Sequence, residues 1–161
     1  MSHFPSRPAG DSAPAARPAA RPDLEAAMEA VNRDLAATLP EAGPMRLPCT
    51  PSDDEDVPDQ YHAALPDGRR HDGVTDPVAA DIAADIADAA QETVQAVLWQ
   101  VWPVCPEHRG GVHAEARSDG GQAVWWCRAG EGHELCEVGG LSQTLGWARR
   151  APRRKERRRA G

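Results

Sequence analysis

The chain has 161 residues, a length typical of a single domain, and a formal net charge of −7. One Phe, one Tyr and fifteen Pro supply few bulky side chains for close packing. The longest uncharged apolar run, residues 93–105, is well short of the roughly 20 residues that a transmembrane helix needs, and the N-terminus has no apolar segment of the secretory type. We therefore expect a cytoplasmic protein, in which four cysteines are more typical of metal ligands or core residues than of disulfides.

Charge is strongly segregated along the chain. Residues 23–92 carry seventeen carboxylates against four Arg, whereas residues 149–161 carry seven Arg and one Lys against a single Glu. Blocks of like charge are usually solvated and often serve as interaction arms. We expect residues 148–161 to form a disordered, Arg-rich tail.

The N-terminal part of the chain predicts one amphipathic helix. Residues 1–22 are rich in Pro, Ala and Arg without periodicity and are expected to be disordered. Residues 23–39 then predict a helix that Asp23 can cap and Pro40 ends. Its apolar face could pack on this chain or on a partner. That face consists of Leu24, Met28, Val31, Leu35 and Leu39.

Residues 40–75 are expected to be an acidic, Pro-rich linker. They contain six Pro, four consecutive acids at 53–56 and a Pro-Asp-Gly turn at 66–68. Cys49 lies in this segment, far from the other cysteines, and a free thiol is its expected state.

A second helix is predicted over residues 76–102. Asp76-Pro77 combines an N-cap residue with a proline at the first helical position, and Pro103 ends the helix. Apolar residues recur along one face of this helix. Its last turn carries Trp99 and Trp102, which are placed to pack against whatever follows.

A β-hairpin and a third strand are predicted after this helix. Residues 112–117 and 122–127 flank a Ser-Asp-Gly-Gly turn, and residues 134–138 form a further short strand. The expected fold class is small α+β, with a long helix packed on a zinc-ribbon-like hairpin or three-stranded sheet. This helix-plus-ribbon module is expected to span residues 76–147.

The strongest chemical signal is a concentration of metal-ligand residues. Residues 105–136 contain Cys105, His108, His113, Cys127, His133 and Cys136. The C-x2-H spacing of Cys105 and His108 lets one tight turn present two ligands, and eighteen residues separate this pair from Cys127. Zinc ribbons separate their ligand pairs by about 15–20 residues, and zinc requires four such ligands in a tetrahedron.

The identity of the fourth ligand is open between two residues. Cys136 would give a Cys3His set and is favoured because thiolates dominate structural zinc sites. His133 would give Cys2His2 and is the alternative. His113 is less suitable because a strand residue five positions after His108 points less readily back to it. In the competing interpretation, the cysteines are small core residues and the histidines lie on the surface.

Stability arguments favour a bound ion. Residues 77–147 form a unit of about 70 residues, in which burial alone rarely leaves more than about 3–5 kcal/mol. A structural zinc ion can contribute on the order of 10 kcal/mol to folding.

Part of the sequence resembles a group of uncharacterised small zinc-ribbon-like proteins of GC-rich bacteria. The resemblance rests on Trp102-Pro-Val-Cys-Pro-Glu-His108, on Trp125-Trp126-Cys127 and on Val138-Gly-Gly-Leu141, which match W-P-x-C-P-x-H, W-x-C and I/V-G-x-L patterns after a long helix. It covers residues 76–141. It implies that Cys105, His108 and Cys127 are the recurrent ligand positions, and it implies no activity.

Enzyme signatures are weak in this sequence. The residues His113-Ala114-Glu115 form the H-x-E that zinc-dependent nucleobase deaminases combine with P-C-x-x-C, but the downstream cysteines lack that spacing. H-E-x-x-H, P-loop and G-x-S-x-G motifs are absent. A deaminase is therefore a remote alternative, and we expect a non-enzymatic zinc-binding structural or interaction module.

A protein partner is expected from the amphipathic helix at 23–39 and from the Trp125-Trp126 pair, of which strand alternation leaves one ring outward. The alternative is a nucleic-acid accessory protein that contacts phosphates through its tail. The basic residues of that tail are Arg149, Arg150, Arg153, Arg154, Lys155, Arg157, Arg158 and Arg159.

Overall fold

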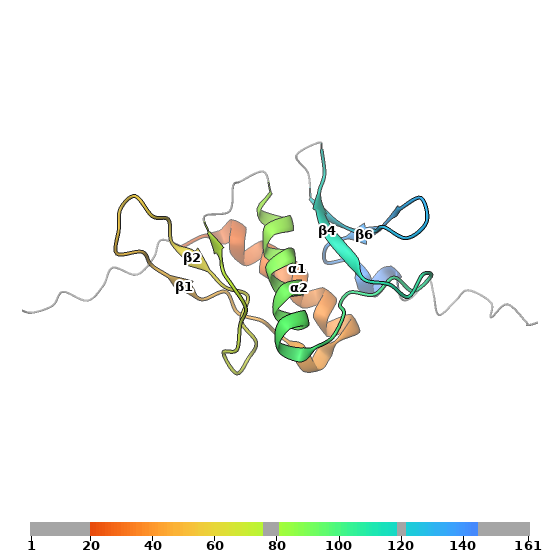
Figure 1. Ribbon diagram of the computed structural model, residues 1–161, viewed down its shortest axis with the longest axis horizontal. Coiled ribbons are helices and arrows are strands. Elements are labelled where there is room, and N and C mark those ends of the chain that lie inside the picture. The colour runs from red at the N-terminus through yellow and green to blue at the C-terminus, as the bar shows by residue number, and fades with distance from the viewer. Residues whose placement is uncertain (1–19, 76–80, 119–121, 145–161) are drawn as a thin grey trace, which may run out of the picture.

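Figure 1 shows the computed structural model, which describes residues 20–75, 81–118 and 122–144. Within these residues two helices lie between two small antiparallel sheets, so the protein has a small α+β fold. The Arg-rich tail, most of the N-terminal segment expected to be disordered and the Asp76-Pro77 helix start lie outside the described residues. No helix in the described part has the length and apolar character that a bilayer span requires.

The first helix, α1, spans Pro22–Thr38, close to the predicted bounds. Arg21 occupies the N-cap position, and Asp23 does not cap the helix but forms an ion pair with Arg21 at 2.9 Å. The apolar face of α1 packs within this chain, so it is not available to an external partner. Its buried apolar residues are Leu24, Ala27, Met28, Val31 and Leu35.

Residues 40–75, expected to be a linker, fold instead into a short 3-10 helix and a sheet. The helix η1 spans Pro40–Ala42. Three antiparallel strands follow in the order β1-β2-β3, with bounds β1 (Cys49–Thr50), β2 (Gln60–Tyr61) and β3 (Val74–Thr75). We call these strands and their flanking bridges the first sheet. Strands of only two residues, separated by proline-containing loops, leave little alternation for a sequence pattern to reveal.

Small apolar side chains join the first sheet to the core. Ala63 and Leu65 are only 1% and 3% exposed. The hydroxyl of buried Thr93, on the second helix, donates a hydrogen bond to the Ala63 carbonyl at 2.8 Å. The predicted Pro-Asp-Gly turn is confirmed, because the Gly68 N–H donates to the Leu65 carbonyl at 2.8 Å.

The second helix, α2, spans Ile82–Leu98 and ends four residues before the predicted Trp102. The helix ends early because Trp99 takes a left-handed conformation with φ of 56°. Trp102 could not extend it, because the residue before a proline disfavours helical geometry. Trp102 leaves the helix and packs edge-on against Trp125, with ring centroids 5.4 Å apart. Trp99 stays 90% exposed, so only one of the two tryptophans packs as expected.

The second sheet agrees with the predicted strands to within one residue at each end. Its strands are β4 (Val112–Ala116), β5 (Ala123–Cys127) and β6 (His133–Glu137), paired antiparallel in the order β4-β5-β6. Helix α2 contacts both β4 and β5. In Figure 1 the two sheets therefore lie on opposite sides of the helix pair.

Candidate metal centre

Two of the candidate ligand residues, Cys105 and His108, lie on a tight turn that follows α2. The Cys105 N–H donates to the Gly110 carbonyl at 2.8 Å, and the Arg109 N–H donates to the Cys105 carbonyl at 2.7 Å. Arg109 has a left-handed φ of 57°, which lets the chain reverse within a few residues. The turn brings His108 Nδ1 to 3.6 Å from the sulfur of Cys105.

Two further candidate ligand residues, Cys127 and His133, lie at adjoining ends of β5 and β6. Cys127 ends β5, His133 begins β6, and the two are paired across the strands. Gly130 and Gly132 both have positive φ in the connecting loop, where other residues would be strained. Gly132 has a second reason to lack a side chain, because a Cβ there would lie 3.1 Å from Trp126 Nε1.

The four side chains converge on one point. His108 Nδ1 lies 3.3 Å from His133 Nε2 and 3.5 Å from Cys127 Sγ, and His133 Nε2 lies 3.6 Å from Cys105 Sγ. All four ligand atoms lie within 4.8 Å of one another. We call Cys105, His108, Cys127 and His133 the metal cluster, because a group with this composition and spacing could hold a metal ion.

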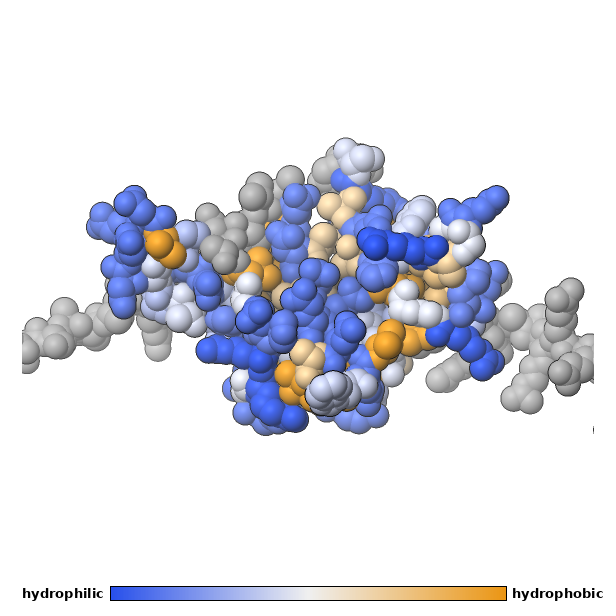
Figure 2. All heavy atoms as spheres, viewed as in Figure 1, coloured by the Kyte–Doolittle hydropathy of each residue, from blue (hydrophilic) through white to orange (hydrophobic). Residues whose placement is uncertain are grey.

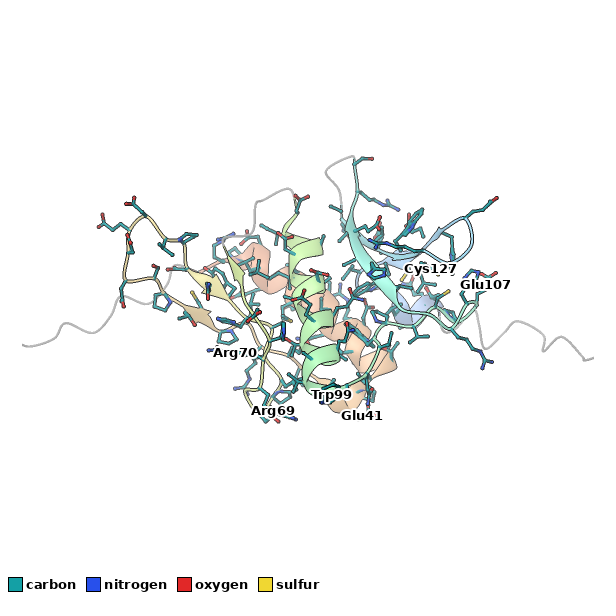
Figure 3. All side chains as sticks on the ribbon, viewed as in Figure 1. Glu41, Arg69, Arg70, Trp99, Glu107 and Cys127 are labelled. Atoms are coloured by element: carbon teal, nitrogen blue, oxygen red, sulfur yellow. The ribbon has the colours of Figure 1, made fainter. Side chains whose placement is uncertain are left out.

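The metal cluster has a buried sulfur side and an accessible nitrogen side. Cys105 and Cys127 are 0% and 1% exposed, whereas His108 is exposed and His133 is half-buried. Burial raises the pKa of the Cys127 thiol, and the neighbouring Cys105 adds to the effect. A buried thiolate needs a compensating cation, and the histidine side leaves a path by which one can enter. Figure 3 shows Cys127 on the β4–β6 side of the molecule.

The structure places Cys136, the fourth ligand that the sequence favours, outside the metal cluster and puts the alternative, His133, inside it. A register irregularity opposite Trp125 and Trp126 interrupts the alternation of β6, so that His133 pairs with Cys127 and Cys136 pairs with Trp125. Trp125 and Cys127 are two residues apart on β5 and share a face, so Cys136 lies on the same side of the sheet as His133 but two residues of β5 farther from the β5–β6 loop. Burial raises the pKa of the Cys136 thiol, while a hydrogen bond with Thr144 opposes the shift. Cys136 is therefore outside the metal cluster because of its position along the strand, where it contacts Thr144.

Two further candidates from the sequence lie apart from the metal cluster. His113 is exposed on β4, opposite Trp126, and Glu115 contacts Arg128 at 3.3 Å. The two residues of the H-x-E pattern therefore do not join the cysteines. Cys49 is a half-buried free thiol on β1, as expected.

One residue that supports the metal cluster is not evident from sequence. The Gln91 side-chain amide, on α2, donates to the carbonyls of Trp102 and Val112, which flank the turn of Cys105. It thereby fixes both ends of the segment that carries the first two ligands. In the sequence, the one sign of this role is that Gln91 is a polar residue close to the apolar face of the helix.

Comparisons of this chain with protein-family models, with curated proteins and with solved structures give no match. The resemblance to small zinc-ribbon-like proteins therefore remains a prediction from sequence. The function of the metal cluster has to be inferred from its own geometry.

Proposed function

We propose that the metal cluster binds one zinc ion whose role is to stabilise the fold. The observation that carries this proposal is the set of distances between the ligand atoms. Zinc at about 2.3 Å from sulfur and about 2.0–2.1 Å from nitrogen, in a regular tetrahedron, sets N···N near about 3.3–3.4 Å and S···N near about 3.5–3.6 Å. The cluster has one N···N separation of 3.3 Å and S···N separations of 3.5 to 3.6 Å.

The ligand count favours a structural ion over a catalytic one. Structural zinc sites have four protein ligands, whereas catalytic sites keep a position for water. Cys105, His108, Cys127 and His133 supply all four. In a deaminase-like site the histidine of H-x-E would bind the metal and its glutamate would stay free, whereas His113 lies outside the metal cluster and Glu115 contacts Arg128 on the outer face of the sheet. We therefore infer a non-enzymatic module.

The arrangement explains what the ion would stabilise. The turn after α2 and the β5–β6 loop have few apolar side chains, and the ligands are at their bases. Zinc would join the two segments and fix them on the second sheet. In this way a small domain replaces part of a hydrophobic core with metal bonds.

Metal content tests the proposal. Untagged full-length protein, measured by inductively coupled plasma mass spectrometry after dialysis, should retain one zinc per chain. Cys127→Ser and His133→Asn should lose most of that zinc. The matched controls are Cys136→Ser and His113→Asn, which replace the same residue types outside the metal cluster and should retain it.

The same experiment decides the fourth ligand. Loss of zinc in Cys136→Ser with retention in His133→Asn would restore the Cys3His set. A wild-type protein that is metal-free, and that refolds without added metal to the same melting temperature, would remove the proposal.

We further infer that the module binds a protein partner through the segment between α2 and the metal cluster. Three large apolar residues are exposed along it, with Trp99 at 90%, Val101 at 61% and Val104 at 44%. Beside them is a groove of about 390 Å³ whose lining includes Leu39 at the end of α1. Figure 2 shows apolar residues at the lower edge of the surface, near the position of Trp99 in Figure 3. Exposed apolar residues that gather beside a groove are typical of interaction sites.

Substitutions in the exposed apolar segment that contains Trp99, Val101 and Val104 test whether it binds a protein partner. A partner that co-purifies with the full-length protein should be lost from the double variant Trp99→Ser with Val101→Ser. Val57→Ser is the matched control, because Val57 is 48% exposed and lies in the β1–β2 loop. Equal recovery of the partner with all variants would exclude this patch as the binding surface.

A further inference from the structure

The outer face of the first sheet carries two arginines that flank one small residue. Beyond the ends of the named strands, Ala64 bridges to Arg46 on one side and to Arg70 on the other, both antiparallel. Ala63 and Leu65 point to the core, so strand alternation directs Ala64 and its two partners outward. Neighbouring Cβ atoms in such a ladder are about 4.5–5.5 Å apart, which lets both guanidinium groups reach the space above Ala64.

A hollow lies at this position. It has a volume of about 460 Å³ and lies between Arg46 and Arg70, with Ala64, Leu65 and the two prolines Pro48 and Pro66 among the residues that line it. Ala64 is only 3% exposed although it faces outward. The hollow therefore combines an apolar floor with two cationic walls, which suits a ligand with one anionic group.

The two arginines have no ion-pair partner among the described residues, although the stretch of sequence that contains them is strongly acidic. Residues 23–92 contain seventeen acidic side chains and four Arg, yet no described carboxylate lies within 4.0 Å of Arg46 or Arg70. Arg69, in the same hairpin, differs because it pairs with Asp67 at 2.7 Å. Two like charges on one face repel each other, and an anion bound between them would remove that cost.

A buried histidine on the same face has one ring nitrogen without a partner. His62 is two residues before Ala64, so its side chain leaves the same side of the strand. It is 9% exposed, its Nε2 lies 3.4 Å from the Thr50 hydroxyl, and its buried Nδ1 has no hydrogen-bond partner. The ring lies over Gly73, where an added Cβ would be 2.8 Å from that Nδ1. Buried polar atoms are rarely left unpaired, so this nitrogen is an unmet hydrogen-bonding requirement on the same face, although His62 is not among the residues that line the hollow.

We propose that Arg46 and Arg70 bind a single oxyanion, a carboxylate or a phosphate group, in the hollow above Ala64. A guanidinium group presents paired N–H donors that match two oxygens of either anion. This site is separate from the metal cluster: Figure 3 shows Arg70 and Cys127 on opposite sides of the helix pair.

Titration with two small anions tests the proposal. Inorganic phosphate and glutarate are added separately to full-length 15N-labelled protein at constant ionic strength, and the Nε–Hε signals of arginine are followed by NMR. At least one anion should shift the Arg46 and Arg70 signals along a saturable curve. Arg46→Gln and Arg70→Gln should each weaken that binding about tenfold, as expected for loss of one charge-assisted interaction.

Arg69→Gln is the matched control, because it removes a neighbouring guanidinium that is already paired. It should leave the affinity unchanged, and circular dichroism should show all three variants folded. Saturation by phosphate alone assigns the site to phosphorylated ligands, and saturation by glutarate alone assigns it to acidic peptides or carboxylic acids. Linear shifts with both anions, or equal weakening in Arg69→Gln, would overturn the proposal.

Discussion

The carboxylate of Asp34 on α1 accepts a hydrogen bond from the indole Nε1 of Trp125 on β5 at 2.7 Å, across 91 positions of sequence. The same carboxylate accepts the N–H groups of Gly139 at 2.6 Å and Leu141 at 2.8 Å. Asp34 is fully buried. One side chain therefore fastens α1 to the central strand of the second sheet and to the turn that leaves β6.

We expect Asp34→Asn to destabilise the protein by about 1–3 kcal/mol, because an amide cannot accept from all three donors and one N–H stays unpaired. Asp34→Ala should cost at least as much, since it leaves every donor unpaired. Urea denaturation followed by tryptophan fluorescence measures both changes. Glu29→Gln, on the exposed face of the same helix, should stay within about 0.5 kcal/mol of the wild type. If Asp34→Ala had the same free energy of unfolding as the wild type, these hydrogen bonds would not stabilise the fold.

The pH dependence of stability gives a separate prediction. Burial raises the pKa of the Asp34 carboxyl, although hydrogen bonds from Trp125, Gly139 and Leu141 oppose the shift. Because the folded state binds this proton more tightly than the unfolded state, protonation of Asp34 stabilises the fold. The full stabilisation is present below the pKa of the unfolded state, about 3.9, and it is lost as the pH rises through the pKa of the folded state.

The loss in unfolding free energy caused by Asp34→Asn should therefore be larger in acid than at neutral pH. Urea denaturation of both proteins, from about pH 4 to about pH 8, measures this difference. Glu29→Gln again serves as the control and should show no such trend. A difference that grows toward neutral pH would mean that the three hydrogen bonds outweigh burial.

Metal removal should act locally before it acts globally. With zinc bound, the amides of residues 105–111 and 128–133 should be protected from hydrogen exchange, because the ligands hold these segments at their bases. Excess chelator should abolish that protection and lower the melting temperature by about 10 °C or more. The first sheet, on the far side of the helices, should keep its exchange rates.

Two variants control this measurement. Cys136→Ser should respond to chelator as the wild type does, whereas Cys105→Ser should show the unprotected pattern without chelator. Identical exchange before and after chelation would mean that no ion holds the two segments together.

The parts of the fold that could be predicted depend on local patterns. The strands of the second sheet are short runs bounded by glycine-containing turns, and the predicted bounds agree with the structure to within one residue. Cys105, His108 and Cys127 were identified by spacing alone, because a C-x2-H turn and a returning hairpin strand suffice to bring them together.

The rest depends on contacts that no local pattern records. In the sequence pattern, Asp34 belongs to the polar face of the first helix. The fold brings the Trp125 indole and two backbone N–H groups to its carboxylate, and no local pattern indicates this. The choice between His133 and Cys136 depends on the irregular register of β6, which pairs His133 with Cys127 at the end of β5 and Cys136 with Trp125 two residues earlier. The first sheet escaped prediction because its strands are very short and its core residues are mainly alanines.

The packing of His62 over Gly73 gives the last prediction. A Cβ on Gly73 would lie 2.7 Å from His62 Cε1 and 3.0 Å from the Tyr61 carbonyl oxygen, so Gly73→Ala should destabilise the protein by about 1–3 kcal/mol. Gly110→Ala is the matched control, because a Cβ there meets nothing within 4 Å. In a His62→Ala background the cost of Gly73→Ala should fall, and a double-mutant cycle in urea measures that coupling. An unchanged cost would place the strain at Tyr61 and not at the His62 ring.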